Sequence, residues 1–224
     1  MKFKIDPKAE TENLPKIVGL VGEWGLISSL KKGYFKWSSE ELSQEVKKLH
    51  KGNKKKFEKI KSYYEGYWSK IEKDYFKEMK KILGYKIDKD KTIYIVPSLY
   101  CNIADVLGRK NAFIVSAEIQ QNPLDFLLLH ELTHLYYADA LIEYNLPKAL
   151  ESPLVEGVDH LILYKSKINK LFSSKKYEDD NFVKSNPEFM NKLEKAWNKR
   201  KDFKSFIQKA IKINESNKKE IKYY

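Results

Sequence analysis

The apolar run from Leu127 to Tyr137 constrains the fold more than any other stretch of the sequence. His130, Glu131 and His134 are the only residues in it that carry or readily acquire a charge near neutral pH. A surface helix of this lysine-rich chain would place Lys or Glu on its outer face, because exposed positions favour charged side chains. We therefore expect a central helix that is buried on all sides.

The limits of this helix can be predicted from the residues that flank the run. Asn122 is a favourable N-cap, and Pro123 suits the first helical position. Leucines then recur at helical spacing to about Tyr144, and Pro147 lies just beyond. The helix is expected to include the whole apolar run with one or two turns on each side.

The run contains a His-Glu-x-x-His motif, formed by His130, Glu131 and His134. Residues four apart share one helix face, with about 6 Å between Cβ atoms, so both imidazoles can reach one zinc ion at about 2.0–2.1 Å. Glu131 projects at a different angle, which leaves its carboxylate available to a water molecule. A chance match is the competing interpretation, but burying these three side chains without a ligand would be costly.

A third ligand is needed, because a catalytic zinc ion usually has three protein ligands and one open position. Glu156 is the best candidate, since it lies in the first turns of the next predicted helix, which can return beside the first. Gly157 would let these two helices approach closely. Glu151, which precedes that helix, and Cys101 are alternatives, although a lone cysteine is more often a small buried apolar residue.

These residues resemble the gluzincin class of zinc metallopeptidases, to which thermolysin belongs. The resemblance extends over about Asn111–Tyr164 and consists of His-Glu-x-x-His on one helix and a glutamate on the next. It implies that His130, His134 and Glu156 hold zinc and that Glu131 is the general base of peptide hydrolysis. Peptide deformylases share the motif and use a cysteine ligand, but their glycine-bearing cysteine motif is not visible in this chain.

The resemblance also implies a surface for the substrate. Asn111 and Ala112, followed by Phe113, look like the edge strand on which thermolysin-like enzymes hold a peptide. A peptide bound in this way adds a strand to the sheet, which is a general mode of peptide recognition. We therefore expect Asn111 and Ala112 to bind the substrate.

The residues after Glu156 depart from the gluzincin pattern. Thermolysin-like enzymes often carry an aspartate four positions after the glutamate ligand, where this chain has His160. Asp159, one position earlier, is then the carboxylate expected to accept a hydrogen bond from a zinc-bound histidine. His160, Tyr164 and Tyr137 are candidates for the donor that stabilises the oxyanion during catalysis.

The rest of the chain predicts a predominantly helical α+β fold, with a small sheet packed beside the metal-binding helix and helical regions at both ends. Short β-branched and aromatic runs predict strands, and apolar residues at steps of three and four predict helices. Strands are expected at 1–5, 92–96 and 111–117, and helices at 14–30, 38–52, 53–84, 122–144, 154–171, after Pro187 and from Phe203.

Three regions can be distinguished along the chain, and we expect them to form one compact unit. Residues 1–90 are a mostly helical, lysine-rich region, residues 91–172 are the gluzincin-like catalytic core, and residues 173–224 are C-terminal helices. The lysines of the first region are expected to form a solvated surface, and its tyrosines to face the core. His50, among these lysines, is expected to be exposed.

The charge of the chain bears on its partners. Lys and Arg together number 43 against 31 acidic residues, which gives a net charge of +12, yet Arg109 and Arg200 are the only arginines. Sequence-specific recognition of nucleic acid relies on the guanidinium group, so no specific nucleic-acid partner is expected. A single cysteine excludes an intramolecular disulfide, and no run is long enough to span a membrane. We expect a cytoplasmic protein without a membrane partner.

Two functions remain open on the sequence alone. The first is a zinc-dependent peptidase acting on peptides or proteins, either active as synthesised or latent with terminal helices over its cleft. The second is a basic module that binds polyanions or proteins and has a structural or inactive zinc site. Glu131 favours the first, because a purely structural site has no use for a free carboxylate beside the metal. The oligomeric state cannot be predicted.

Overall fold

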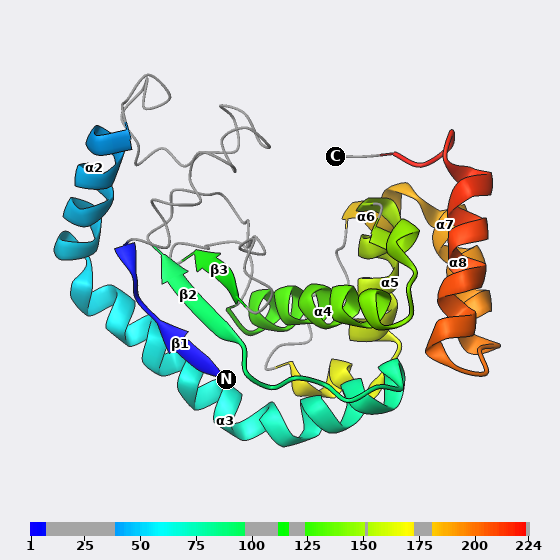
Figure 1. The fold of residues 1–224 in the computed structure, drawn as a ribbon, viewed down its shortest axis with the longest axis horizontal. Helices are drawn as coiled ribbons and strands as arrows, with labels where there is room; N and C mark the ends of the chain where they lie inside the picture. Colours follow the sequence, from blue (N-terminus) through cyan, green and yellow to red (C-terminus); the bar gives the residue numbers. More distant parts are fainter. Residues whose placement is uncertain (8–38, 97–111, 117–123, 151, 173–180, 223–224) are drawn as a thin grey trace. The chain divides into compact units, whose positions relative to one another are not determined.

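A computed structural model describes residues 1–7, 39–96, 112–116, 124–150, 152–172 and 181–222 (Figure 1). It confirms a predominantly helical α+β fold. The strands are β1 Lys2–Lys4, β2 Thr92–Val96 and β3 Ala112–Ser116, and the α-helices are α2 Ser39–Gly52, α3 Lys54–Leu83, α4 Leu124–Glu143, α5 Ser152–Tyr164, α6 Asn181–Ser185, α7 Pro187–Asn198 and α8 Phe203–Asn217. Two 3-10 helices, η3 Pro147–Leu150 and η4 Lys167–Leu171, complete the described elements. The predicted helix at 14–30, Cys101, Asn111, the cap at Asn122 and Pro123, and Glu151 lie outside the described residues.

The chain divides into two compact units that alternate along the sequence. The sheet unit comprises Met1–Lys70 and Asp88–Glu131, and the helical unit comprises Ile71–Ile87 and Leu132–Tyr224. Both boundaries between the units fall inside long helices, one within α3 and one within α4.

The sheet unit contains a parallel sheet with strand order β1-β2-β3. Ile93 of β2 pairs with Phe3 on one side and with Phe113 on the other. Ile93 is fully buried, as expected for a central strand of β-branched residues. The ring of Phe3 stacks on Tyr64 of α3 at a centroid distance of 5.8 Å, so the α3 tyrosine stripe packs against this sheet.

Helices α2 and α3 meet at Asn53, which interrupts the helical pattern where the sequence predicted a break. The Asn53 side-chain amide donates to the carbonyl of Leu49 at 3.0 Å. His50, in the last turn of α2, is only 7 % exposed and lies edge-on to Phe57, with ring centroids 5.3 Å apart. The prediction of an exposed His50 is therefore wrong. Its position four residues after the buried Val46 places it on the inner face of α2 despite the surrounding lysines.

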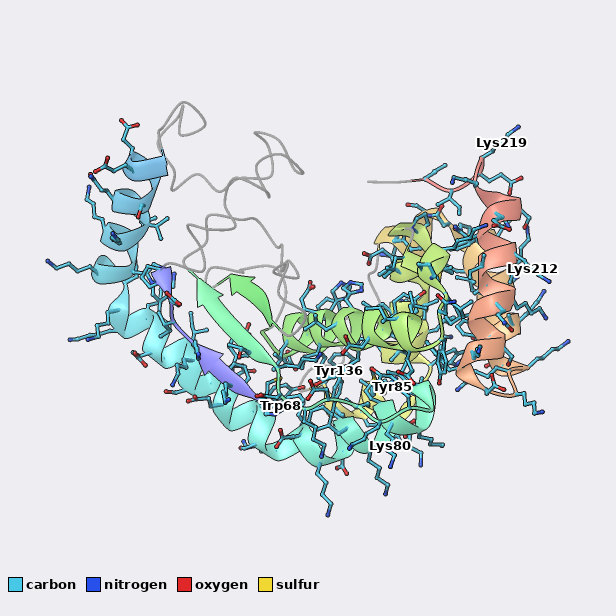
Figure 2. The ribbon with its side chains drawn as sticks, in the orientation of Figure 1. Trp68, Lys80, Tyr85, Tyr136, Lys212 and Lys219 are labelled. Carbon is cyan, nitrogen blue, oxygen red and sulfur yellow. The ribbon has the colours of Figure 1, made fainter. Side chains whose placement is uncertain are left out.

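Helix α4 is buried over most of its circumference, as the apolar run predicted, while His130 and His134 stay partly exposed. Leu128, Leu129, Leu132, Leu135 and Tyr136 are each at most 2 % exposed. In the helical unit, the hydroxyl of Tyr85 donates to the carbonyl of Tyr136 at 3.2 Å (Figure 2). The hydroxyl of Tyr144 donates to the carbonyl of Leu83, where α3 ends. These contacts fix α4 against the end of α3.

Helix α5 is shorter than predicted. It ends at Tyr164 rather than near Leu171, because Ser166 stops it and begins η4. The Ser166 hydroxyl donates to the carbonyl of Ile162 at 2.6 Å and accepts from the amide of Ile168 at 3.0 Å. A serine that caps its neighbours in this way competes with helix continuation.

Gly157 allows a close approach, but to α7 rather than to α4. A Cβ atom at Gly157 would lie 2.7 Å from Cδ1 of Leu193 and 3.3 Å from Cε1 of Phe189. The prediction named the wrong partner, because spacing along the sequence does not reveal which of several helices packs on a given face.

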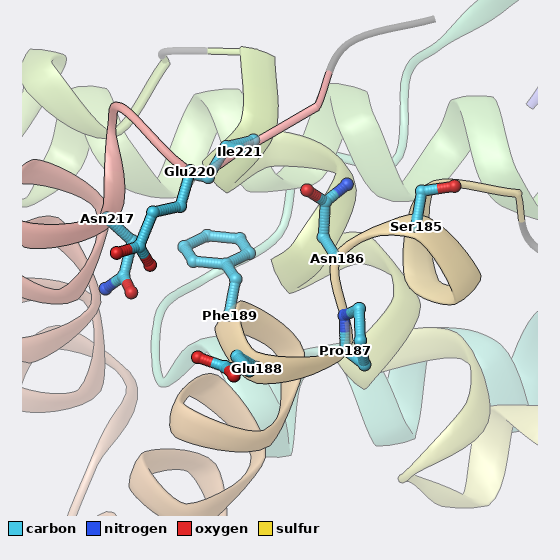
Figure 3. Close-up of a pocket in the computed structure, with 8 residues that line it drawn as sticks. All are labelled: Ser185, Asn186, Pro187, Glu188, Phe189, Asn217, Glu220 and Ile221. Atoms are coloured by element: carbon cyan, nitrogen blue, oxygen red, sulfur yellow. The ribbon is translucent and has the colours of Figure 1, made fainter.

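The C-terminal helices are held together around Asn186, between α6 and α7. Its side chain donates to the carbonyl of Lys222 at 3.1 Å and accepts from the amide of Lys222 at 2.8 Å. The segment after α8 is thereby tied to the start of α7. Figure 3 shows Asn186, Phe189 and Ile221 around a hollow of about 330 Å³ between these segments. Helices α7 and α8 lie side by side (Figure 1).

Candidate metal centre

His130 and His134 of α4 and Glu156 of α5 form a group that could hold a metal ion. One ligand atom from each lies within 4.8 Å of the others, and all three side chains are partly exposed. The two histidines are brought together by their spacing of four on one helix, as predicted. The glutamate comes from the helix and the position that the sequence favoured.

The distances within this group suit an ion rather than direct hydrogen bonds. Nε2 of His134 lies 3.8 Å from Oε1 of Glu156, beyond the range of an N–H···O hydrogen bond. Two ligands at about 2.0–2.1 Å from a tetrahedral zinc ion are separated by about 3.3 Å. The His134–Glu156 pair is thus about half an ångström wider than this spacing, and the ligand atoms of all three residues lie within 4.8 Å of one another, so the residues present fit a metal ion.

The two ring nitrogens of His134 face different carboxylates. Nε2 faces Glu156, whereas Nδ1 lies 4.0 Å from Oδ1 of Asp159. Asp159 is 1 % exposed, and Glu156 has 38 % of its side chain exposed. A histidine ligand commonly offers one nitrogen to the metal and the other N–H to a carboxylate, which fixes its orientation. Each ring nitrogen of His134 thus faces its own carboxylate, at a distance longer than a hydrogen bond.

Glu131 lies beside the group but is not a member of it. Its Oε1 atom is 4.0 Å from Nε2 of His130, and 10 % of its side chain is exposed. Phe126, one turn before His130, packs on the imidazole with ring centroids 5.4 Å apart. A carboxylate held next to the ligands, yet not among them, can exchange a proton with a small molecule bound there.

Two residues near this site were not predicted from the sequence. The hydroxyl of Tyr75, on α3, lies 3.3 Å from Oγ1 of Thr133, which stands between the two histidines on α4. Burial raises the pKa of Tyr75 above its usual value, and the negative charge of Asp159 adds to the rise. Both side chains are fully buried. No sequence signal distinguishes Tyr75 from the other tyrosines of the α3 stripe, so only the fold could reveal it.

The three candidates for an oxyanion donor differ in their surroundings. His160 and Tyr164 lie one and two turns after Glu156 on α5, with ring centroids 4.7 Å apart, and neither belongs to the metal-binding group. The hydroxyl of Tyr137 donates to the carbonyl of Ala149 at 2.9 Å, and burial raises its pKa. Tyr137 therefore secures the segment after α4.

The predicted substrate strand is only partly described. Ala112 is the first residue of β3 and pairs with Thr92 of β2. Among the described strands β3 has a neighbour on one side only, which is the arrangement needed for a peptide to add as a further strand. Asn111 precedes the described part of β3.

No protein-family model, curated protein or solved structure matches this chain. The chemistry of the site is therefore inferred from its own residues. None of the helices that the structure describes is both long and apolar enough to cross a membrane.

Proposed function

We propose that the protein is a zinc-dependent peptidase of the gluzincin type, with His130, His134 and Glu156 as metal ligands. The observation that carries the proposal is the position of Glu131, whose carboxylate lies 4.0 Å from the His130 ring without belonging to the ligand group. A two-histidine, one-carboxylate set also suits other divalent metals, including iron. A carboxylate beside the ligand group but outside it favours zinc and hydrolysis over the alternatives.

When bound, the metal would supply Lewis acidity, polarising a peptide carbonyl and lowering the pKa of water. Glu131 accepts the proton of the attacking water and returns it to the nitrogen of the leaving amine. Asp159 keeps the His134 ring in the orientation that directs Nε2 to the metal. His160 or Tyr164 donates a hydrogen bond to the oxygen that becomes negatively charged.

The proposed substrate is a peptide or a protein segment in an extended conformation, bound along β3 through Asn111 and Ala112. Its support is the position of β3 at the edge of the described sheet. Pairing with a strand edge recognises the backbone of a peptide rather than particular side chains, so broad specificity is expected. We propose the cytoplasm as the site of action, in keeping with the single cysteine of the chain.

Replacement of Glu131 by Gln tests the proposal, because it removes the base while keeping the shape of the side chain. We expect metal content equal to that of the parent and a loss of peptide hydrolysis of about 10²–10⁴-fold. Glu143→Gln, an exposed change on the same helix, is the matched control and should keep full activity. Zinc content is measured by elemental analysis, and hydrolysis by digestion of a peptide pool with mass-spectrometric detection.

The outcomes separate the peptidase from its main alternative. If the Glu131→Gln variant digests peptides as fast as the parent, Glu131 is not the base. If the zinc-loaded parent cleaves nothing in the pool while binding metal tightly, the site is structural or inactive, as in a polyanion- or protein-binding module.

A further inference from the structure

The sheet unit contains a second hollow, at the corner between α2 and α3. It has a volume of about 360 Å³, within the usual range for small-ligand sites. Its lining comes from the segment after β1, the last turns of α2 and the first turns of α3. The residues that line it are Ile5, Pro7, Lys47, His50, Lys51, Lys54 and Glu58. We refer to this hollow as the lysine cavity.

Three lysines line the lysine cavity. Lys47 and Lys51 stand one turn apart on α2, and Lys54 begins α3. All three are exposed, and none of them has an ion-pair or hydrogen-bond partner among the residues that the structure describes. By contrast, Lys61 and Glu65 form an ion pair at 2.9 Å about two to three turns further along α3. The cavity lysines are therefore available to an external anion.

The sequence around the cavity is unusually basic for a helix start. Between residues 47 and 61, Glu58 is the only acidic residue among eight lysines. The first turn of α3 contains no acidic residue, although the partial positive charge of a helix N-terminus favours one. Lys54, Lys55 and Lys56 occupy that turn instead. The positive charges of these lysines repel one another, and a bound anion reduces that repulsion.

Part of the lining of the lysine cavity is not charged. Ile5 and Pro7 contribute apolar surface, and His50 is buried beside them. Burial lowers the pKa of His50 to about 4, with an opposing contribution from the charge of Asp6. The imidazole is therefore neutral at pH 7, and it offers a hydrogen-bonding nitrogen rather than charge.

We propose that the lysine cavity binds a small anion that carries two or three clustered phosphate groups. Each ammonium group offers three donors, and lysine binds phosphate as a point charge. Three lysines around one hollow match a diphosphate or triphosphate better than a single carboxylate. The limited volume accommodates a small molecule, whereas a nucleic-acid strand needs a continuous track of contacts.

Titration calorimetry with inorganic pyrophosphate tests this proposal on the full chain. The buffer contains a chelator and no divalent metal, so that the anion cannot bind through a metal at the His130 group. We expect one saturable site per chain, with an affinity that falls as salt is added, because charged contacts at an open cavity are screened. Absence of saturable binding at low salt overturns the proposal.

Matched substitutions locate the binding. Replacing Lys47, Lys51 and Lys54 together by Gln should weaken pyrophosphate binding by at least about tenfold, since hydrogen bonds to charged groups are lost. Replacing all three by Arg keeps the charges, and should keep the binding, which controls for misfolding. An equal loss in a second triple variant, with exposed α3 lysines replaced by Gln, would show a diffuse charge effect and overturn the proposal. The replaced control lysines are Lys73, Lys77 and Lys80.

Glu58 provides a test of opposite sign. Its carboxylate lines the cavity and repels an anion, so Glu58→Gln should strengthen pyrophosphate binding a few-fold. A general loss of helix stability in this variant would weaken binding instead. Unchanged or weaker binding by Glu58→Gln, in a variant with the circular dichroism of the parent, would contradict the assignment.

Clustered phosphates occur both on free anions and on phosphoinositide headgroups, and sedimentation with vesicles separates these sources. The vesicles consist of phosphatidylcholine with a minor fraction of phosphatidylinositol bisphosphate. Chain that sediments with them, and no longer does so after the triple Gln change, identifies a headgroup ligand. Chain that stays in solution while binding pyrophosphate identifies a free anion. Sedimentation that the triple change leaves intact would overturn the proposal.

Discussion

Asp159→Asn separates an orienting function of this residue from a purely structural one. The carboxylate is 1 % exposed and lies 4.0 Å from Nδ1 of His134, the ring nitrogen that faces away from Glu156. The change keeps the size of the side chain and removes its charge. If Asp159 orients His134 for the metal, the metal-bound and metal-free proteins should respond in opposite directions.

The expected magnitude follows from the geometry. Loss of a partner that orients a metal-binding histidine typically lowers metal affinity 10–100-fold, which corresponds to about 1.4–2.7 kcal/mol. Metal that binds only the folded protein stabilises it, and weaker binding reduces this stabilisation by the same amount, about 1.4–2.7 kcal/mol, when metal is in excess. The metal-dependent rise in Tm should therefore shrink by about 3–11 °C for a chain of this size. In the metal-free protein the change removes a buried charge, and Tm should stay the same or increase.

Thermal unfolding with zinc and with a chelator measures both effects, and competition with a chromophoric chelator gives the zinc affinity. Asp125→Asn is the matched control, because Asp125 is also 1 % exposed. Asp125 accepts a hydrogen bond from the amide of Phe126 in the first turn of α4. Its replacement should lower Tm equally with and without zinc. The reasoning is refuted if Asp159→Asn keeps the zinc-dependent rise of the parent, or if it destabilises the metal-free protein as much as the metal-bound one.

Three further predictions concern the ligand set, the acid range and the helix packing. Glu156→Ala should weaken zinc binding far more than Glu151→Ala, as measured by chelator competition, because a carboxylate oxygen of Glu156 lies within 4.8 Å of ligand atoms of both histidines. Burial lowers the pKa of His50 from 6.5 to about 4, so its neutral form stabilises the fold above pH 6.5, and this contribution is lost as the pH falls toward 4. Urea unfolding at several pH values should therefore show a shallower loss of stability over that range in His50→Gln than in the parent. Gly157→Ala should lower the free energy of unfolding by about 1–3 kcal/mol, since the new Cβ would lie 2.7 Å from Leu193, and a normal urea midpoint in that variant would contradict the packing of α5 on α7.

The elements with strong periodicity could be predicted from the sequence. Helix α3 ends at Leu83, where Gly84 adopts a positive φ of 74°, next to the predicted limit. Helix α4 ends at Glu143, within one residue of its predicted limit. Both helices carry regular apolar residues and are followed by residues that end a helix, so local information is sufficient.

The missed features depend on contacts between distant segments. The burial of His50 arises from the packing of α2 on its neighbours, whereas the surrounding sequence is dominated by lysine. The contact between Tyr75 and Thr133 joins residues from two helices that are far apart in sequence. The interleaving of the two compact units follows from long helices that take part in both, and composition does not reveal it.

For the candidate site, the sequence predicts which residues lie close together but not which of them contact each other. Helical spacing alone places His130 and His134 together, and the position of Glu156 follows from the start of α5. Spacing also places Asp159 and His160 near the same face of that helix, but it cannot decide which of them meets His134. In the structure the buried carboxylate of Asp159 lies 4.0 Å from Nδ1 of His134.

Charge provides an independent reason to expect a cation at this site. The chain has 43 Lys and Arg residues, yet neither α4 nor α5 contains one. The same two helices contain six acidic residues, and three of them, Glu131, Glu156 and Asp159, lie within about 4 Å of a ring nitrogen of His130 or His134. Carboxylates gathered in an apolar environment repel one another unless positive charge is placed between them. Lysine occurs on the other α-helices that the structure describes. The absence of lysine from α4 and α5 suggests that the compensating charge is a divalent metal rather than an ammonium group. An ammonium group here would compete with the metal for Glu131 and Glu156.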